Sequence, residues 1–374
     1  MQTAGYIGVP PGRFSLKFTQ KNKSSSLERG SDLRLQKRHF PKNKTNGLSF
    51  IYGKIVYMSS LKTIFFGTPQ LAVPYLELVR QMTDLQLSVT QADKPRGRGM
   101  QVSACPVKAR ALELGVPVLS PEKLKDDFDK IAATPFDLGI AVAYGKIFRP
   151  DFLALPKLGI LNVHFSLLPL LRGAAPVQQA LIQGHTQTGI SVFWIRPGLD
   201  DGPLFLQKKL EILPQDNAQT LFEKLIPLGL EGLKEVLTRL QNGENVQIAQ
   251  QGTPSVAPML AKQDALLHPA ALTARQLHNR IRGLACGPKP KVPFNNEWVQ
   301  VLRSELGQQE TTASPGTVLS IEREKGILVK CKEGALWLQM LQPAGKKPMA
   351  AYDFANGRGL KINQCVFVEN ANER

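Results

Sequence analysis

Short apolar stretches alternate with amphipathic stretches through the middle of the chain. Strand-like apolar runs, bounded by Gly, Pro or polar residues, occupy 62–67, 85–91, 137–145 and 158–165. Apolar residues recur at helical spacing in 71–82, 107–115 and 175–184. This alternation predicts an open, mostly parallel α/β sheet with helices between its strands.

The same region closes with an antiparallel pair and a long helix. Residues 188–195 and 203–213 are predicted to pair as strands, and residues 217–243 form a predicted helix that ends at Gly243. The next segment, 244–258, is rich in Gln, Gly, Pro and Ser, which is typical of a linker. We therefore expect one domain over 58–243.

Beyond residue 258 the pattern changes. A predicted helix over 272–284 is followed by short strand-like runs between Gly and Pro turns, at 297–306, 316–322, 326–331 and 335–342. This spacing fits a small, OB-like β-barrel. We expect residues 259–374 to form a second domain.

Residues 1–57 show no sustained period and are expected to be disordered. One interpretation is a transit peptide, which the low acid content favours and which would send the protein to an organelle. The other is an upstream in-frame extension of a protein that starts at Met58. We favour the second, because the stretch lacks an Arg-bearing amphipathic helix and apolar alternation begins only after Met58.

The formal net charge of +17 lies mainly at the two ends of the chain. Residues 1–57 hold 11 Lys and Arg against 2 Asp and Glu, residues 58–258 hold 20 against 18, and residues 259–374 hold 16 against 10. The basic second domain therefore suits a polyanionic partner. The 4 cysteines are scattered without metal-ligand spacing, and no apolar run is long enough to span a membrane, so we expect neither a metal nor a membrane partner.

Candidate chemistry lies at the end of one predicted strand. Asn162 and His164 are one residue apart, so their side chains share a face. At the carboxyl edge of a sheet, both could donate hydrogen bonds to the oxyanion of a tetrahedral intermediate. An isolated pair of this kind is more often a turn cap and a packed core histidine, so that alternative stays open.

A second stretch, "RPGLDDGPL" at 196–204, places two carboxylates in a Gly-rich turn. Asp200 or Asp201 could approach His164 and stabilise its protonated form, or help to remove a proton from an attacking amine. Asp is also a common turn residue, which is the alternative.

These motifs closely resemble those of the folate-dependent formyltransferases, and residues 61–368 resemble the methionyl-tRNA formyltransferases in particular. The segments that carry the resemblance occur in the family's order: "IFFGTPQLAVPYL" (64–76), "DKPRGRG" (93–99), "PVKARA" (106–111), "VAYGKI" (142–147), "LNVHFSLLPLLRGAAP" (161–176), "GLDDG" (198–202) and "LQPAGKKPM" (341–349). An ordered set of this size is highly specific. It implies a Rossmann-like formyltransferase domain.

The resemblance also implies a reaction: one-carbon formyl transfer from the co-substrate 10-formyltetrahydrofolate to the α-amine of methionyl initiator tRNA, without a metal. The product, N-formylmethionyl-tRNA, serves translation initiation. By this resemblance Asn162 and His164 hold the developing oxyanion. Asp200 would orient or charge His164 and assist proton removal, and Asp201 has no assigned role.

A third motif would meet the folate. In the family, the segment matching these four residues lies against the cofactor: Ser166, Leu167, Leu168 and Pro169. The alternative is a strand-ending turn that only fixes the sheet edge. The family usually continues with Arg-Trp-Arg-Gly, whereas this chain has Leu170 and Leu171 before its Arg-Gly, so an aromatic side chain is missing.

Basic residues are the candidate tRNA contacts. The loop 91–101 matches one that inserts at the acceptor stem in the family; we expect Arg98 to make the principal contact, with Lys94 and Arg96 attracting phosphates. A solvated charge run is the alternative. Six basic residues of the second domain could also meet phosphates: Arg280, Arg282, Lys289, Lys291, Lys346 and Lys347.

Three other functions remain possible from the sequence. A formyltransferase acting on glycinamide ribonucleotide or an amino sugar could share the same three site residues, but would need neither the basic barrel nor the loop. A noncatalytic RNA-binding protein is a second alternative. A hydrolase using Ser166, His164 and Asp200 is weaker, because no GxSxG elbow is present. We expect a monomeric, bacterial-type cytoplasmic enzyme.

Overall fold

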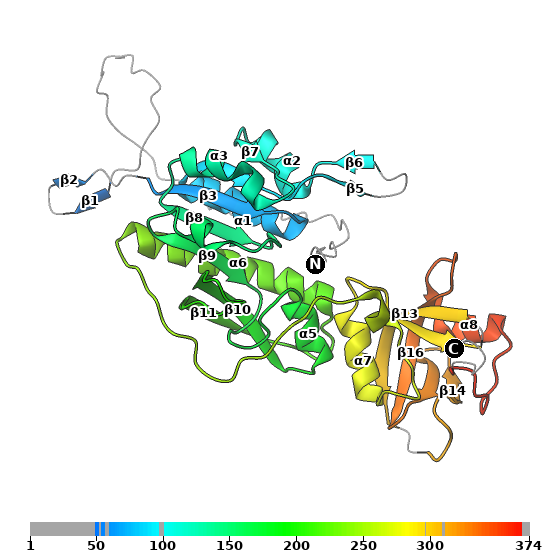
Figure 1. Ribbon diagram of the computed structural model, residues 1–374. Helices are drawn as coiled ribbons and strands as arrows, with labels where there is room; N and C mark the ends of the chain where they lie inside the picture. The colour runs from blue at the N-terminus through cyan, green and yellow to red at the C-terminus, as the bar shows by residue number, and fades with distance from the viewer. Residues whose placement is uncertain are drawn as a thin grey trace, which may run out of the picture. The chain divides into compact units, whose positions relative to one another are not determined.

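The computed structural model describes residues 49–51, 54–56, 60–96, 101–295, 297–308 and 311–368 (Figure 1). Strands β1 (Ser49–Ile51) and β2 (Lys54–Val56) form an antiparallel pair. The rest of the predicted extension 1–57, and the predicted start Met58, lie outside the described residues. Within the described part of the chain, no helix is long and apolar enough to cross a membrane.

A seven-stranded sheet organises the larger domain, with the strand order β11-β10-β9-β8-β3-β4-β7. Its parallel strands are β3 (Lys62–Gly67), β4 (Asp84–Val89), β7 (Val118–Leu119), β8 (Leu138–Val142) and β9 (Gly159–His164). Two antiparallel strands extend one edge, β10 (Gln187–Trp194) and β11 (Leu204–Glu211). The predicted mostly parallel α/β fold is confirmed.

Apolar runs account for this sheet. Every residue of β8 is buried, as is every residue of β3 after Lys62, which is typical of parallel strands covered on both faces. The main covering helices are α1 (Val73–Met82), α2 (Pro106–Glu113), α5 (Pro176–Ile182) and α6 (Ala218–Gln241). Shorter helices are α3 (Phe128–Ala133) and α4 (Pro150–Leu153).

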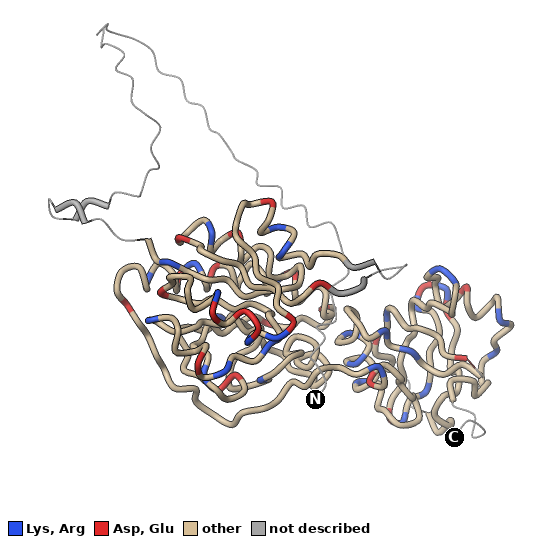
Figure 2. The backbone as a smooth tube through the Cα atoms, turned by 45° about the horizontal axis from the view of Figure 1, so that its top comes forward, with Lys and Arg blue, Asp and Glu red and all other residues tan. Residues whose placement is uncertain are grey.

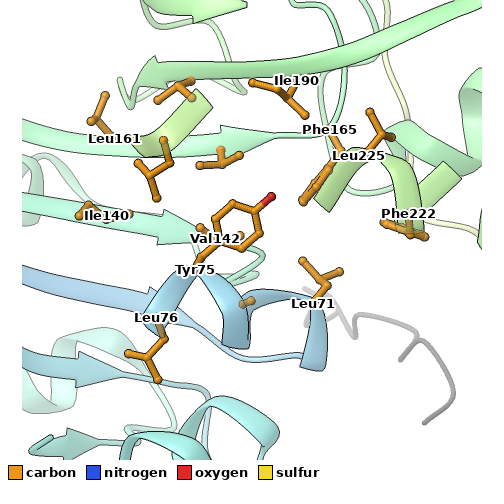
Figure 3. Packing of buried hydrophobic residues seen from close by; sticks show 14 of the residues in the cluster. Leu71, Tyr75, Leu76, Ile140, Val142, Leu161, Phe165, Ile190, Phe222 and Leu225 are labelled. Atoms are coloured by element: carbon orange, nitrogen blue, oxygen red, sulfur yellow. The ribbon is translucent and has the colours of Figure 1, made fainter. Parts of the chain in front are cut away.

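Tyr75 joins α1 to α6 inside this domain. Figure 3 shows its ring among Leu71, Val142 and Phe165, and the Tyr75 side chain is fully buried. Its hydroxyl donates a hydrogen bond to the Ile226 carbonyl of α6 at 3.0 Å. Burial raises the pKa of Tyr75 well above its usual range, so the hydroxyl stays a donor.

The strand order creates a crevice at one edge of the sheet. After β3 the chain continues to β4 and β7, and then returns to β8 on the other side of β3. The connections that leave β3 and β8 therefore diverge, and the carboxyl ends of these strands border an open space.

The predicted linker, residues 244–258, does not run freely between the domains. Its Ile248 pairs with Leu204, and its Val256 pairs with Arg172, both in isolated bridges. Pairing of the linker with the larger domain brings polar linker side chains to the sheet edge.

The second domain is built on a six-stranded antiparallel sheet, so the predicted C-terminal β domain is confirmed. The sheet follows helix α7 (Ala274–Gly283) and includes β12 (Lys291–Phe294), β13 (Glu297–Gly307), β14 (Val318–Glu322), β15 (Gly326–Lys330), β16 (Ala335–Gln342) and β17 (Met349–Ala350), before helix α8 (Ala351–Gly357). A separate core lies beneath it, with the Phe294 ring 4.9 Å from Phe354 and 5.5 Å from Phe367.

Candidate active site

A cleft that is partly open to solvent lies where β3, β8 and β9 end. Pro69 follows β3, Ala143 follows β8, and residues 162–165 come from the end of β9. Apolar side chains form much of its lining: Leu71, Val177, Phe222, Met259 and Leu260. A largely apolar lining at the carboxyl edge of a parallel sheet is typical of a site for a small organic molecule.

Asn162 and His164 both line this cleft. The structure therefore brings the two side chains together, as their period-2 spacing predicts. The Asn162 amide makes no hydrogen bond to any residue that the structure describes. It is half-buried, so its N–H donors are available to a molecule in the cleft.

The imidazole of His164 forms a hydrogen bond through one nitrogen and faces a carboxylate with the other. Its Nε2 lies 2.9 Å from the Leu171 carbonyl oxygen, and because a carbonyl only accepts, Nε2 is the donor. Its Nδ1 lies 3.7 Å from Asp200 Oδ2. That separation is too long for a hydrogen bond but suits an ion pair once the ring carries a second proton.

Asp200 reaches the site from the turn after β10. Its Oδ2 accepts a hydrogen bond from the Gly173 N–H at 2.8 Å, so the carboxylate ties two loops together rather than capping its own turn. Asp200 has φ of 46° and Leu171 has φ of 59°, a left-handed conformation that is uncommon for residues with side chains. The neighbouring Asp201 is exposed.

Comparison with known proteins agrees with these motifs. Residues 61–237 match the family model described as "Formyl transferase", and residues 260–359 match "Formyl transferase, C-terminal domain". The methionyl-tRNA formyltransferase of Elusimicrobium minutum (strain Pei191) is 44% identical over 332 residues, which cover 82% of this chain and 100% of that protein. This chain belongs to the methionyl-tRNA formyltransferase family. The methionyl-tRNA formyltransferase of Synechococcus elongatus is 40% identical, covering 80% of this chain and 98% of that protein.

Two solved structures share the fold of this chain. An N-formyltransferase from Helicobacter canadensis, solved with folinic acid and dTDP-3-aminofucose, matches with a TM-score of 0.57 at 17% identity, covering 75% of this chain and 99% of that one. HypX from Aquifex aeolicus, solved with tetrahydrofolic acid, matches with a TM-score of 0.53 at 12% identity, covering 82% of this chain and 49% of that one. At these identities the likeness is one of fold.

The predicted folate segment of this formyltransferase lies outside the residues that line the cleft. Its main-chain groups bond to the protein: Leu168 N–H donates to Ser191 Oγ at 3.1 Å, and Gln207 Nε2 donates to the Leu168 carbonyl at 2.8 Å. Ser191 Oγ donates to the Ser166 carbonyl at 2.7 Å. These bonds fix the turn, and contact of residues 166–169 with folate stays a prediction.

The two leucines that replace the family's Arg-Trp have different environments. Leu171 is 2% exposed and packs in the core of the larger domain, whereas Leu170 is 39% exposed. Leu171 therefore fills interior space and presents its carbonyl to His164, so its role in the site is through the main chain.

The predicted tRNA loop is in part a hairpin stem. Strands β5 (Lys94–Arg96) and β6 (Gln101–Ser103) pair antiparallel, and Arg98 lies outside the described residues. The ion pair between Lys108 Nζ and Asp93 Oδ2, 2.6 Å long, lies at the base of the stem. Lys94, Arg96 and Arg98 stay predicted tRNA contacts.

One predicted phosphate contact in the second domain has another role. Arg282 Nη1 donates to the carbonyls of Pro214 at 3.1 Å and Asp216 at 2.9 Å, and Nη2 donates to Asn279 Oδ1 at 2.8 Å. This guanidinium joins α7 to the loop before α6 and is not placed for phosphate. Figure 2 shows that other Lys and Arg positions are spread over the second domain.

Sequence reasoning missed two site residues in the linker, Gln250 and Ser255. Their side chains form hydrogen bonds with the loops that carry Asp200 and Leu171. The only local signal was the polar composition of the segment, which is equally typical of a spacer.

Proposed function

We propose that this chain transfers the formyl group of 10-formyltetrahydrofolate to the α-amine of methionyl initiator tRNA. The acceptor is supported by 40 to 44% sequence identity to methionyl-tRNA formyltransferases over 98 to 100% of their length. The donor is supported by fold neighbours that were solved with tetrahydrofolic or folinic acid. The observation that carries the chemistry is the Asn162 amide in the cleft beside His164, which has no hydrogen-bond partner among the described residues.

In this mechanism the neutral amine attacks the formyl carbon, and the carbonyl oxygen becomes an oxyanion. Asn162 donates an N–H to that oxygen as its charge grows, in a partly water-excluded cleft where such a bond stabilises strongly. The new C–N bond forms first and gives a tetrahedral intermediate, which collapses to the formamide as the bond to N10 of the folate breaks. The amine loses one proton, and N10 gains one.

His164 and Asp200 handle the proton. In this proposal the oxyanion contact that the sequence predicts for His164 falls to Asn162 alone, because the Leu171 carbonyl holds the Nε2–H of His164. A proton taken up by His164 then goes to Nδ1, which lies toward Asp200. The carboxylate stabilises the imidazolium that forms. An aminoacyl ester lowers the basicity of its amine, so this assistance need only be moderate near neutral pH.

The two domains would divide the work. Residues 58–243 carry the chemistry, residues 244–258 connect, and the basic residues 259–374 bind tRNA backbone. The 91–101 hairpin would meet the acceptor stem through Arg98, and residues 166–169 would lie against the folate. We also propose a monomer acting in the cytoplasm; sedimentation of the purified chain tests its oligomeric state.

The decisive experiment measures formyl transfer to three acceptors: methionyl initiator tRNA, methionyl elongator tRNA and glycinamide ribonucleotide. We expect selective formylation of the initiator, and a fall in kcat of about 10² to 10³-fold in Asn162→Ala. Equal or better use of the small acceptor would overturn the tRNA assignment. Binding of tRNA without turnover on any acceptor would support a noncatalytic protein instead.

A further inference from the structure

Gln250 of the linker joins two loops of the active site. Its Oε1 accepts from Arg172 Nη2 at 2.7 Å and from Arg172 Nε at 3.2 Å. Its Nε2 donates to the carbonyls of Asp200 and Gly202, each at 2.8 Å. Both N–H donors and the carbonyl oxygen of this amide are therefore engaged, although the residue stands in a segment of spacer-like composition.

Ser255 holds the other loop. Its Oγ accepts from the Leu171 N–H at 2.9 Å, and its carbonyl accepts from the Arg172 N–H at 2.8 Å. The pairing continues with Ala257, whose N–H donates to the Arg172 carbonyl at 2.7 Å. The linker thus forms a short strand-like contact along the segment that leads into α5.

The linker bonds reach the two residues that lie against the His164 ring, Leu171 and Asp200. Leu171 and Asp200 both have positive φ, a conformation that persists at non-glycine residues only when the surroundings fix it. The Leu171 carbonyl accepts from His164 Nε2, and the Asp200 carboxylate faces His164 Nδ1. Each nitrogen of the imidazole is therefore opposed by a residue that the linker holds.

We propose that Gln250 and Ser255 are positioning residues for the reaction: they hold Asp200 and Leu171 in the conformations that orient His164. These two residues of the linker then support the active site, whereas their exposed neighbours Gln251 and Thr253 do not. This inference rests on the proposed formyl transfer, in which His164 takes part.

Matched variants separate positioning from charge and composition. Gln250→Glu keeps the shape and the acceptor for Arg172 but loses both N–H donors, and Gln251→Glu makes the same charge change at the exposed neighbouring residue. Ser255→Ala removes the acceptor for Leu171, and Ser255→Thr retains a hydroxyl. Thr253→Ala is the control for loss of an exposed linker hydroxyl.

We expect kcat for methionyl initiator tRNA to fall about 10- to 100-fold in Gln250→Glu and in Ser255→Ala, as for groups that orient a reacting side chain. KM for the tRNA and for 10-formyltetrahydrofolate should stay within about twofold of wild type. Ser255→Thr should restore most of kcat, and the two controls should match wild type.

A readout independent of turnover is the ¹⁵N signal of the His164 ring, assigned by its loss in His164→Gln. It should report a protonated, hydrogen-bonded Nε2 in wild type and should shift in Ser255→Ala and Gln250→Glu, with melting temperatures measured alongside. If the wild type is active and the Gln250 and Ser255 variants match the controls in kcat and in ring signal, the positioning role is wrong and the proposed function stands. Lower kcat with a lower melting temperature and an unchanged ring signal also overturns it, in favour of general destabilisation. An inactive wild type overturns the proposed function, while the ring signal still tests the positioning.

Discussion

Replacing Asp200 with Asn tests whether His164 carries positive charge during the reaction. The substitution removes one negative charge but keeps an oxygen that can accept from the Gly173 N–H. At the 3.7 Å that separates Asp200 Oδ2 from His164 Nδ1, two unit charges attract by about 4 kcal/mol at an effective dielectric constant of about 20. The Asp200 side chain is 19% exposed and that of His164 is 6% exposed, so solvent screening lowers this only in part. We expect a loss of about 2 to 4 kcal/mol in transition-state stabilisation, or about 30- to 1,000-fold in rate.

The assay is single-turnover formylation of methionyl initiator tRNA with enzyme and folate in excess, which isolates the chemical step. Asp201→Asn is the matched control, because it makes the same change in net charge at an exposed residue one position away. Its rate should stay within about twofold of wild type. If Asp200→Asn reacted as fast as Asp201→Asn, the imidazolium of His164 would have no part in the mechanism.

Three further predictions concern stability and backbone geometry. A Cβ at Gly229 would overlap the Tyr75 hydroxyl, so Gly229→Ala should lower the free energy of unfolding by about 1 to 3 kcal/mol. In a Tyr75→Phe background the same substitution should lower it by clearly less. Urea unfolding measures both changes, and equal effects in the two backgrounds would exclude this contact as the cause. Burial, with two nearby arginines, lowers the pKa of His278 to about 4 from 6.5. Between these two values the unfolded chain therefore binds more protons than the folded chain. The free energy of unfolding should decrease as the pH is lowered through that window, by at most about 1.4 kcal/mol per pH unit. Unfolding titrations should show a smaller slope in His278→Gln but not in His185→Gln, and an unchanged slope in His278→Gln would contradict the assignment. Gly173 has φ of 118° and a Cβ there would lie 2.8 Å from a linker carbonyl, so Gly173→Ala should lower kcat through its N–H bond to Asp200; a kcat equal to that of wild type would show that this bond is dispensable.

The elements that local pattern predicts are those whose signal repeats over several residues. Apolar runs predict β3, β8 and β9, and apolar residues at helical spacing predict α1 and α6. Short elements such as β12 and β17 were not predicted, because two to four residues hold too little periodicity.

The position of Asn162 beside His164 is likewise local, because alternate residues of a strand share one face. The family's motifs add candidate site residues before any fold is known. Sequence alone therefore yields the fold class, the family and the shared strand face of Asn162 and His164.

Contacts between distant loops were decided only by tertiary structure. Gly173 and Asp200 are 27 residues apart, and Gln250 and Asp200 are 50 apart, yet they meet at one hydrogen-bonded cluster. No periodicity links such positions, because the contacts arise when the sheet edge, the β10–β11 turn and the linker fold onto one another. By composition Gln250 stands in a polar segment typical of a spacer, and it supports the active site only because folding places partly buried acceptors and donors around its amide.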